Sequence, residues 1–237
     1  MRAFSQTDRG MKRDNNEDCA FMDEEKRIYI VADGMGGHNA GEVASRIACE
    51  AVKTQIGQRI EAGTFDFETQ IEEILKFAND EINKFGNEHS EYSNMGTTIV
   101  VAYFDNEMLY VANVGDSRLY LVNEATLHQI TKDHSLVAEL IKIGSISEAE
   151  AYSHPDRNII TSALGVDDTF EIYQTKIPFF EYQYALLCTD GLTNMVSEEE
   201  LFDVLGQEAF ENAASKMIEL ANQNGGFDNI TVICIKL

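Results

Sequence analysis

The sequence contains few basic residues, few prolines and no tryptophan. Lysine and arginine together number 18, against 41 aspartates and glutamates, which gives a formal net charge of −23. This shortage of positive charge argues against proteins that bind nucleic acid or anionic membranes through a basic surface. An acidic chain of this kind collects cations, binds a basic partner or is simply an acidic cytosolic protein, and the charge alone leaves all three open.

Long hydrophobic runs and an N-terminal apolar signal segment are also missing. A membrane-spanning helix needs about 18 consecutive apolar residues, and no run in the chain approaches that length. The cysteines number four, Cys19, Cys49, Cys188 and Cys234, and none forms a C-x-x-C pair. We therefore expect reduced, packed thiols in a soluble protein of the cytoplasm.

No low-complexity linker and no repeat interrupts the 237 residues, of which 44% are hydrophobic. A chain of this length and composition can bury one substantial core. We therefore expect a single domain that spans residues 1–237.

Short segments rich in β-branched and aromatic residues predict strands, and apolar residues at a 3.6-residue spacing predict helices. The predicted strands are Ile28–Ala32, Thr97–Phe104, Leu109–Val114, Arg118–Val122, Tyr184–Cys188 and Ile230–Ile235. The predicted helices cover 43–52, 71–85 and 210–222, and Ser147–Glu150 and Ser197–Glu200 have the spacing of capping boxes. A tight hairpin is predicted at Gly115-Asp116-Ser117. Because the helices lie between runs of consecutive strands, they are expected to pack on an antiparallel or mixed sheet.

The stretch YIVADGMGGH, residues 29–38, ends a buried-looking strand on Asp33 and continues with glycine-rich backbone. Glycine allows a turn with positive φ or the close approach of another group. A dinucleotide-binding fingerprint fails here, because Asn39 occupies the place of its last glycine. A phosphate-binding loop that runs from Gly36 to Gly41 fails as well, because glutamate and valine follow where lysine and serine or threonine are required.

Acidic side chains recur at the ends of the most buried strands. The strand-end carboxylates are Asp33, Asp116, Asp190 and Asp228, and the segment RDNNED adds Asp14, Glu17 and Asp18. Each residue alone is more simply explained as a turn or cap residue. Several buried carboxylates together repel one another, and a divalent metal removes that repulsion. All-oxygen ligands suit Mg²⁺ or Mn²⁺ and not zinc, and the carbonyl of Gly34 could join them.

With these residues the sequence resembles the metal-dependent serine/threonine protein phosphatases of the protein phosphatase 2C family, in its compact bacterial form. The resemblance covers essentially the whole chain, and its motifs occur in the family's order. They are RDNNED, VADGMGGHNAGE, MGTT, VGDSR, TKDHSL, HPDRNIITSALG, LLCTDGL and DNITV. The resemblance implies an α+β fold, a four-layer α-β-β-α sandwich with two central antiparallel sheets flanked by helices.

The resemblance also assigns roles to individual residues. It places the first metal on Asp33, Asp190 and Asp228, and the second on Asp33 and the Gly34 carbonyl with help from Glu17. Asp18 matches a carboxylate near the same cluster, and Asp116 with Asp190 matches a third, weaker metal site. Arg13 matches the residue that grips the substrate phosphate, and His38 matches the proposed proton donor. Residues from about 133 to 165 match a variable flap that influences substrate access.

The implied reaction is hydrolysis of phosphoserine and phosphothreonine in proteins by a water that bridges two Mn²⁺ or Mg²⁺ ions. Such an enzyme reverses Ser/Thr kinase signalling, so we expect phosphorylated proteins and a Ser/Thr kinase as partners, no nucleic acid, no membrane insertion and a monomer. Arginine at position 13 suits a bidentate grip on phosphate oxygens.

Two other functions compete with this hypothesis. A phosphoprotein-binding module of the same fold, without turnover, predicts that metal ligands are lost, and every expected ligand is present. A two-metal hydrolase of small phosphoesters or nucleic acid would need a basic track or base-stacking groove, and the chain has no tryptophan and an unfavourable charge.

Overall fold

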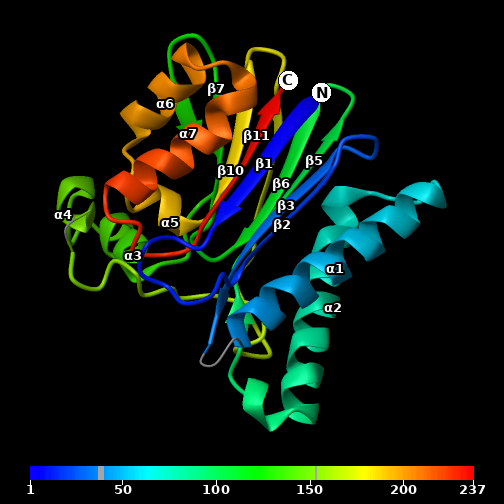
Figure 1. The fold of residues 1–237 in the computed structure, drawn as a ribbon. Coiled ribbons are helices and arrows are strands. Elements are labelled where there is room, and N and C mark those ends of the chain that lie inside the picture. Colours follow the sequence, from blue (N-terminus) through cyan, green and yellow to red (C-terminus); the bar gives the residue numbers. More distant parts are fainter. Residues whose placement is uncertain (37–39, 153) are drawn as a thin grey trace.

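The computed structural model describes residues 1–36, 40–152 and 154–237. Its strands form two stacked sheets, with helices on the outer side of each (Figure 1). In chain order the elements are β1 (Arg2–Asp8), β2 (Asp18–Asp23), β3 (Ile28–Met35), α1 (Ala40–Glu61), α2 (Phe67–Glu88), a 3₁₀ turn (Ser90–Tyr92), β4 (Gly96–Thr97), β5 (Ile99–Asp105), β6 (Met108–Val114), β7 (Arg118–Val122), β8 (Leu127–Gln129), α3 (Leu136–Lys142), α4 (Glu148–Tyr152), β9 (Tyr173–Pro178), β10 (Tyr184–Cys188), α5 (Asp190–Thr193), α6 (Glu198–Gln207), α7 (Phe210–Gln223) and β11 (Ile230–Lys236).

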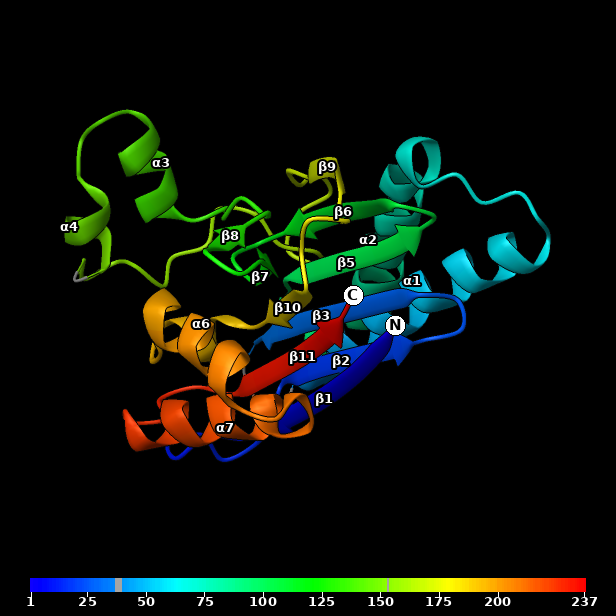
Figure 2. The same cartoon turned by 90° about the horizontal axis from the view of Figure 1, so that it is seen from above.

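The sheets are antiparallel throughout the part of the chain that is described. One sheet has five strands in the order β1-β11-β10-β7-β8, and the other has six, in the order β2-β3-β5-β6-β9 with β4 paired to β3. The view in Figure 2 shows α1 and α2 beside the larger sheet and α6 and α7 beside the smaller one. The expected four-layer sandwich of two antiparallel sheets flanked by helices is confirmed.

Alternating side chains on the strands explain this stacking. In β3, Ile28, Ile30 and Ala32 pack with α1 and α2, whereas Tyr29 and Val31 belong to the core between the sheets. A strand that is apolar on both faces is typical of a sheet covered on both sides. A third cluster packs α5, α6 and α7 against the outer face of the smaller sheet.

The predicted helices are confirmed, and each extends beyond the residue range predicted for it. The stripe on α2 is buried as predicted, with Ile71, Ile74 and Leu75 fully covered. The capping box predicted at Ser197 and Glu200 begins α6. The four cysteines are free, and three of them are buried, so the expected packing of most of the thiols is confirmed. No helix in the described ranges is long and apolar enough to cross a bilayer.

The predicted hairpin at 115–117 is wrong. β6 and β7 flank this turn, but β6 lies in the six-stranded sheet and β7 in the five-stranded one, so the turn carries the chain from one sheet to the other. Gly115 has φ +95°, which allows the sharp change of direction. The predicted strand Thr97–Phe104 is also divided, because Thr98 separates β4 from β5.

Candidate active site

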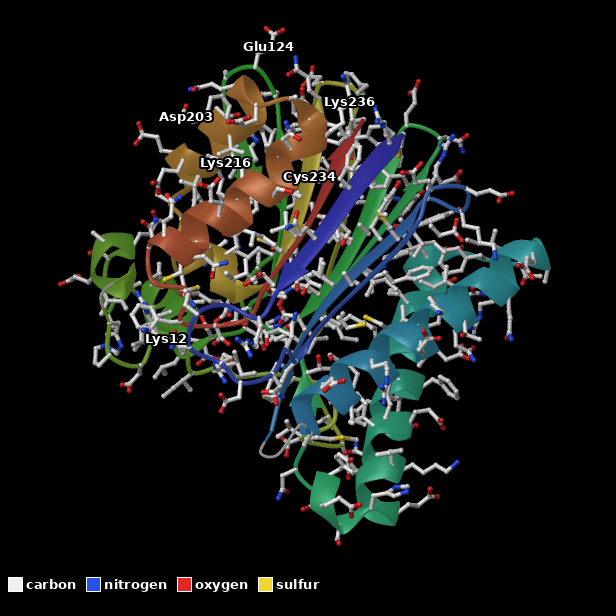
Figure 3. All side chains as sticks on the ribbon, in the orientation of Figure 1. Lys12, Glu124, Asp203, Lys216, Cys234 and Lys236 are labelled. Carbon is white, nitrogen blue, oxygen red and sulfur yellow. The ribbon has the colours of Figure 1, made fainter. Side chains whose placement is uncertain are left out.

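The candidate residues lie together at one end of the two sheets. Arg13 and Glu17 lie on the loop between β1 and β2, Asp33 lies near the end of β3, and Asp190 and Asp228 flank β10 and β11. Figure 3 shows Lys12 of the same loop at this end of the molecule, and Glu124 and Lys236 at the opposite end. Asp33 is therefore contributed by the larger sheet, and Asp190 and Asp228 by the smaller one.

Asp18 faces Asp33 across the antiparallel pair of β2 and β3. One oxygen of Asp18, Oδ2, accepts a hydrogen bond of 2.8 Å from the Thr189 hydroxyl, whereas Oδ1 is buried without a donor among the described residues. Burial, reinforced by the charges of Asp190 and Asp228, raises the pKa of Asp18 to about 7. Like charges placed opposite each other on neighbouring strands are destabilising, so this pair needs a cation.

Asp33 and Asp190 extend the acidic cluster across the sheets. Burial and then the charges of Asp18 and Asp190 hold the pKa of Asp33 well above its usual range. Burial and the charge of Asp228 raise the pKa of Asp190 to about 6, although a hydrogen bond between the Asp190 and Asp33 side chains opposes this shift. Asp190 Oδ2 also accepts from Asn194 at 2.9 Å, while its Oδ1 is buried with no donor in the described ranges.

Asp116 joins the cluster from the turn between the sheets. Its pKa is well above the ordinary value, first because the carboxyl is buried and then because Asp190 and Asp133 carry the same charge. The Asp116 charge also acts on Asp33. Asp116 and Asp190 both line a cavity of about 1150 Å³, and its other walls include residues of the flap and of the segment 193–198. This cavity therefore connects the flap to the acidic cluster.

Arg13 is a cation that lies directly against a carboxylate of the site, Asp228. Its Nη2 atom lies 2.7 Å from Asp228 Oδ2, and about half of the Arg13 side chain, 49%, is exposed. Partial burial would lower the pKa of Arg13, but the charges of Asp228, Asp33 and Glu17 outweigh that effect and raise it. One guanidinium thus stays charged beside the cluster, with donors left for a further anion.

Glu17 and Gly34 pack closely against the start of α1. The Gly34 amide donates to the Glu17 carbonyl at 3.1 Å. A Cβ atom on Gly34 would lie 2.0 Å from the carbonyl oxygen of Gly41, and one on Gly41 would lie 2.5 Å from Glu17 Oε2. Only glycine fits at position 34, so this backbone approaches the cluster without a side chain in the way. His38, the predicted proton donor, lies outside the described residues.

Asn229 is a site residue to which the sequence patterns assigned no role. Its side-chain nitrogen, Nδ2, donates to the backbone carbonyls of Arg9 and Asn15 at 2.9 and 2.8 Å. Its Oδ1 accepts from the backbone amide of Glu17 at 2.8 Å. One buried side chain thus fixes the β1–β2 loop beside Asp228. Its place in the motif DNITV, directly after a ligand candidate, is the sequence signal that could have indicated this role.

The carboxylates fit a hard divalent cation in their chemistry. The two orphaned oxygens of Asp18 and Asp190, together with the raised pKa values, are the features expected where anions lack a counter-charge. Among the residues described, no group of three or more His, Cys, Asp and Glu side chains lies at the spacing that would hold a metal ion. The donors of the cluster are all oxygens, the ligand type of hard ions that keep several waters.

Comparisons with known proteins agree with this geometry. The family model described as Protein phosphatase 2C matches residues 8–225. The serine/threonine phosphatase stp of Listeria welshimeri is 41% identical over 241 residues, which cover 100% of this chain and 96% of the relative. Protein phosphatase PhpP of Streptococcus pneumoniae is 37% identical, and the match covers 98% of this chain and 95% of the length of PhpP.

Solved structures show the same fold. Serine/threonine phosphatase Stp1 from Staphylococcus aureus superposes with a TM-score of 0.89 at 37% identity, covering 99% of this chain and 94% of that one. The catalytic domain of the phosphatase PstP, solved in complex with two manganese ions, superposes with a TM-score of 0.87 at 33% identity. The match covers 98% of this chain and 96% of the PstP chain. The sequence match and the shared fold together show that the chain belongs to the protein phosphatase 2C family.

Proposed function

We propose that the chain is a Mn²⁺- or Mg²⁺-dependent phosphatase that hydrolyses phosphoserine and phosphothreonine in proteins. The observation that carries the proposal is the convergence of buried carboxylates from both sheets beside Arg13. Metal-dependent dephosphorylation is the general activity of the family to which the chain belongs. The relatives from Listeria welshimeri and Staphylococcus aureus are serine/threonine phosphatases, which supports the same substrate class.

The proposed metal ligands are the residues that the resemblance indicated. Asp33, Asp190 and Asp228 would hold one ion, and Asp33 with the Gly34 carbonyl a second, assisted by Glu17. Asp18 lies close enough to add its charge, and Asp116 with Asp190 would hold a third. When bound, such ions activate water for attack on phosphorus and offset the charge of the substrate, about −2.

The side chains of this protein then bind and orient the substrate. The Arg13 guanidinium would grip phosphate oxygens, and its pairing with Asp228 sets its position beside the cluster. His38 is proposed to give a proton to the leaving serine or threonine oxygen, because an alkoxide leaves poorly without one. The flap, 133–165, borders the cavity that opens onto Asp116 and Asp190, so it is proposed to contact the protein around the phosphorylated residue.

The finer features of this function are also proposals. We propose one catalytic domain over 1–237, a monomer in the cytoplasm, and a Ser/Thr kinase with its substrates as partners. The net charge of −23 supports protein rather than nucleic-acid substrates.

The proposal is tested with p-nitrophenyl phosphate and a phosphothreonine peptide, each assayed with and without Mn²⁺. We expect turnover of both substrates with metal, none after chelation, and none in an Asp190→Ala variant that remains folded by circular dichroism. Turnover that survives chelation or this substitution would show that the proposed function is wrong. Tight binding of the phosphopeptide without turnover would instead support a phosphoprotein-binding module.

A further inference from the structure

His134, at the base of the flap, forms two hydrogen bonds to the residue that precedes Asp116. The His134 amide donates to the Gly115 carbonyl at 3.0 Å, and the Gly115 amide donates to the imidazole Nδ1 of His134 at 3.1 Å. One histidine thus satisfies both polar backbone groups of Gly115. His134 is buried, with 6% of its surface exposed, so water does not compete readily for these bonds.

Gly115 is held from its other side as well. A Cβ atom on Gly115 would lie 2.5 Å from the Thr98 side chain, so Thr98 packs directly against the glycine. The Thr98 hydroxyl is hydrogen-bonded to Ser117 at 2.7 Å. Asp116 therefore lies between two anchored residues, and the His134 bonds fix the backbone from which its carboxylate extends.

The same histidine lies where the two ends of the flap meet. The His134 carbonyl accepts from the Thr161 amide at 2.9 Å, and the next residue, Ser135, forms a β-bridge with Ile160. Asp133 pairs with Arg118 at 2.6 Å, which attaches the flap to β7 directly after the Asp116 turn. The entry and exit of the flap are thus joined to the Asp116 turn at a single place.

We propose that His134 is a positioning residue that holds the Asp116 carboxylate in the acidic cluster and couples the base of the flap to it. The inference rests on the proposed function, because Asp116 matters here as a proposed metal ligand. The imidazole touches neither substrate nor metal in this scheme, and it acts through the Gly115 backbone. A displacement of the flap base would pass to Asp116 through the hydrogen bonds of His134.

Two substitutions distinguish this role from general packing. His134→Asn keeps a hydrogen-bond acceptor at the position of Nδ1, whereas His134→Gln moves the acceptor to the position of Nε2, away from Gly115. Both replacement side chains are polar, and neither is much larger than the side chain of histidine. Each is made alone and combined with Asp116→Asn, in the whole chain.

The first measurement is hydrogen exchange at the Gly115 amide, which needs neither metal nor turnover. We expect exchange at least about tenfold faster in His134→Gln than in the unchanged chain, and near-normal exchange in His134→Asn. Equal exchange rates in the unchanged chain and the Gln variant would overturn the proposal.

The second measurement is Mn²⁺ binding by calorimetry, paired with the Mn²⁺ concentration for half-maximal turnover of p-nitrophenyl phosphate. We expect His134→Gln to weaken the Asp116-dependent binding by about tenfold, as for other residues that orient metal ligands. It should have no further effect when Asp116→Asn is already present. An equal loss in both backgrounds would overturn the proposal, because His134 would then act without Asp116. If the unchanged chain binds Mn²⁺ but turns nothing over, the proposed function fails, and hydrogen exchange and calorimetry still decide the role of His134.

Discussion

Asp18 and Asp33 are directly paired residues of β2 and β3, so two carboxylates occupy opposite positions on neighbouring strands. A sheet gains stability when such pairs attract and loses it when they repel. Here the repulsion is retained next to further carboxylates, and the hydrogen bonds of Asp18 to the hydroxyls of Thr189 and Thr231 bring no positive charge. The strand register itself therefore builds a place for positive charge.

The acidic cluster predicts an unusual dependence of stability on pH. Mainly because they are buried, Asp18 has a pKa of about 7 and Asp190 one of about 6 in the folded protein. In the unfolded chain both would titrate near 3.9, so between about pH 4 and 7 the folded state binds more protons. The free energy of unfolding should therefore fall as pH rises through this window, by at most about 1.4 kcal/mol per pH unit for each proton involved.

Urea unfolding in EDTA at several pH values from about 5 to 8 measures this dependence. Asp18→Asn is the matched variant, because it keeps the shape of the side chain and removes one charge. Its stability should fall less steeply with pH than that of the unchanged chain. Stability that rises with pH in EDTA would show that the buried carboxylates do not hold protons in the folded state.

Asp190→Asn should separate activity from stability. The amide can still accept from Asn194, but it no longer supplies an anionic ligand. Loss of several kcal/mol of electrostatic stabilisation corresponds to about a thousandfold or more in turnover. Without metal, the melting temperature should stay the same or rise, because one repelling charge is gone. Assays with p-nitrophenyl phosphate and calorimetric melting in EDTA check both statements, and a variant that is equally active would refute the first.

Arg13→Ala should weaken phosphate binding. A charge-assisted hydrogen bond contributes about 1.5–3 kcal/mol, which is about 10- to 100-fold in affinity. We expect KM for a phosphopeptide and the inhibition constant of inorganic phosphate to rise together. Arg13→Lys keeps the charge but loses the planar fork, so it should recover only part of the loss. Unchanged phosphate inhibition in Arg13→Ala would remove Arg13 from the binding site.

Asn229→Ala should loosen the β1–β2 loop. Three hydrogen bonds to the backbone of residues 9, 15 and 17 would be lost. We expect a cost of about 2–3 kcal/mol in the free energy of unfolding and faster hydrogen exchange at Glu17. Asn224→Ala is the control, because the Asn224 side chain is exposed and donates a hydrogen bond to the Met195 carbonyl alone among the described residues. Equal effects of the two substitutions would contradict the role assigned to Asn229.

Gly34→Ala should be strongly destabilising, because its Cβ would lie 2.0 Å from the Gly41 oxygen and 2.6 Å from the Glu17 oxygen, both backbone atoms. Overpacking of this kind costs about 1–3 kcal/mol or more. Gly206→Ala in α6 is the control, since nothing lies within 4 Å of the added Cβ, and it should stabilise the helix by about 0.5–1 kcal/mol. Thermal melts of the two variants should shift in opposite directions.

The sequence predicted those elements whose own residues carry a strong periodic signal. The apolar stripe from Ile71 and the capping box at Ser197 are local patterns, and both are confirmed. β1 and β2 escaped prediction because each is only partly buried and mixes polar with apolar residues, so neither forms an apolar run. β1 is a strand because β11, far away in the sequence, completes its sheet, whereas β2 pairs with β3, which follows it directly in the chain.

The turn at Gly115 shows where local reasoning fails. Glycine and aspartate between two apolar strands suit a hairpin, but the pairing of β6 with β5 and of β7 with β10 sends the strands into different sheets. The carboxylates of the site could be predicted from the sequence, because they are acidic residues that stand at the ends of apolar strands. The supporting contacts of His134 and Asn229 join segments distant in the chain, and no local pattern predicts them.

The passage of the chain between sheets at Gly115 has a consequence for the whole molecule. Asp33 moves with the larger sheet, whereas Asp190 and Asp228 move with the smaller one. The spacing of these acids is therefore governed by how closely the sheets stack, which depends on interior side chains such as Tyr29 and Leu187. A change in volume midway between the layers would alter ion affinity without touching any ligand.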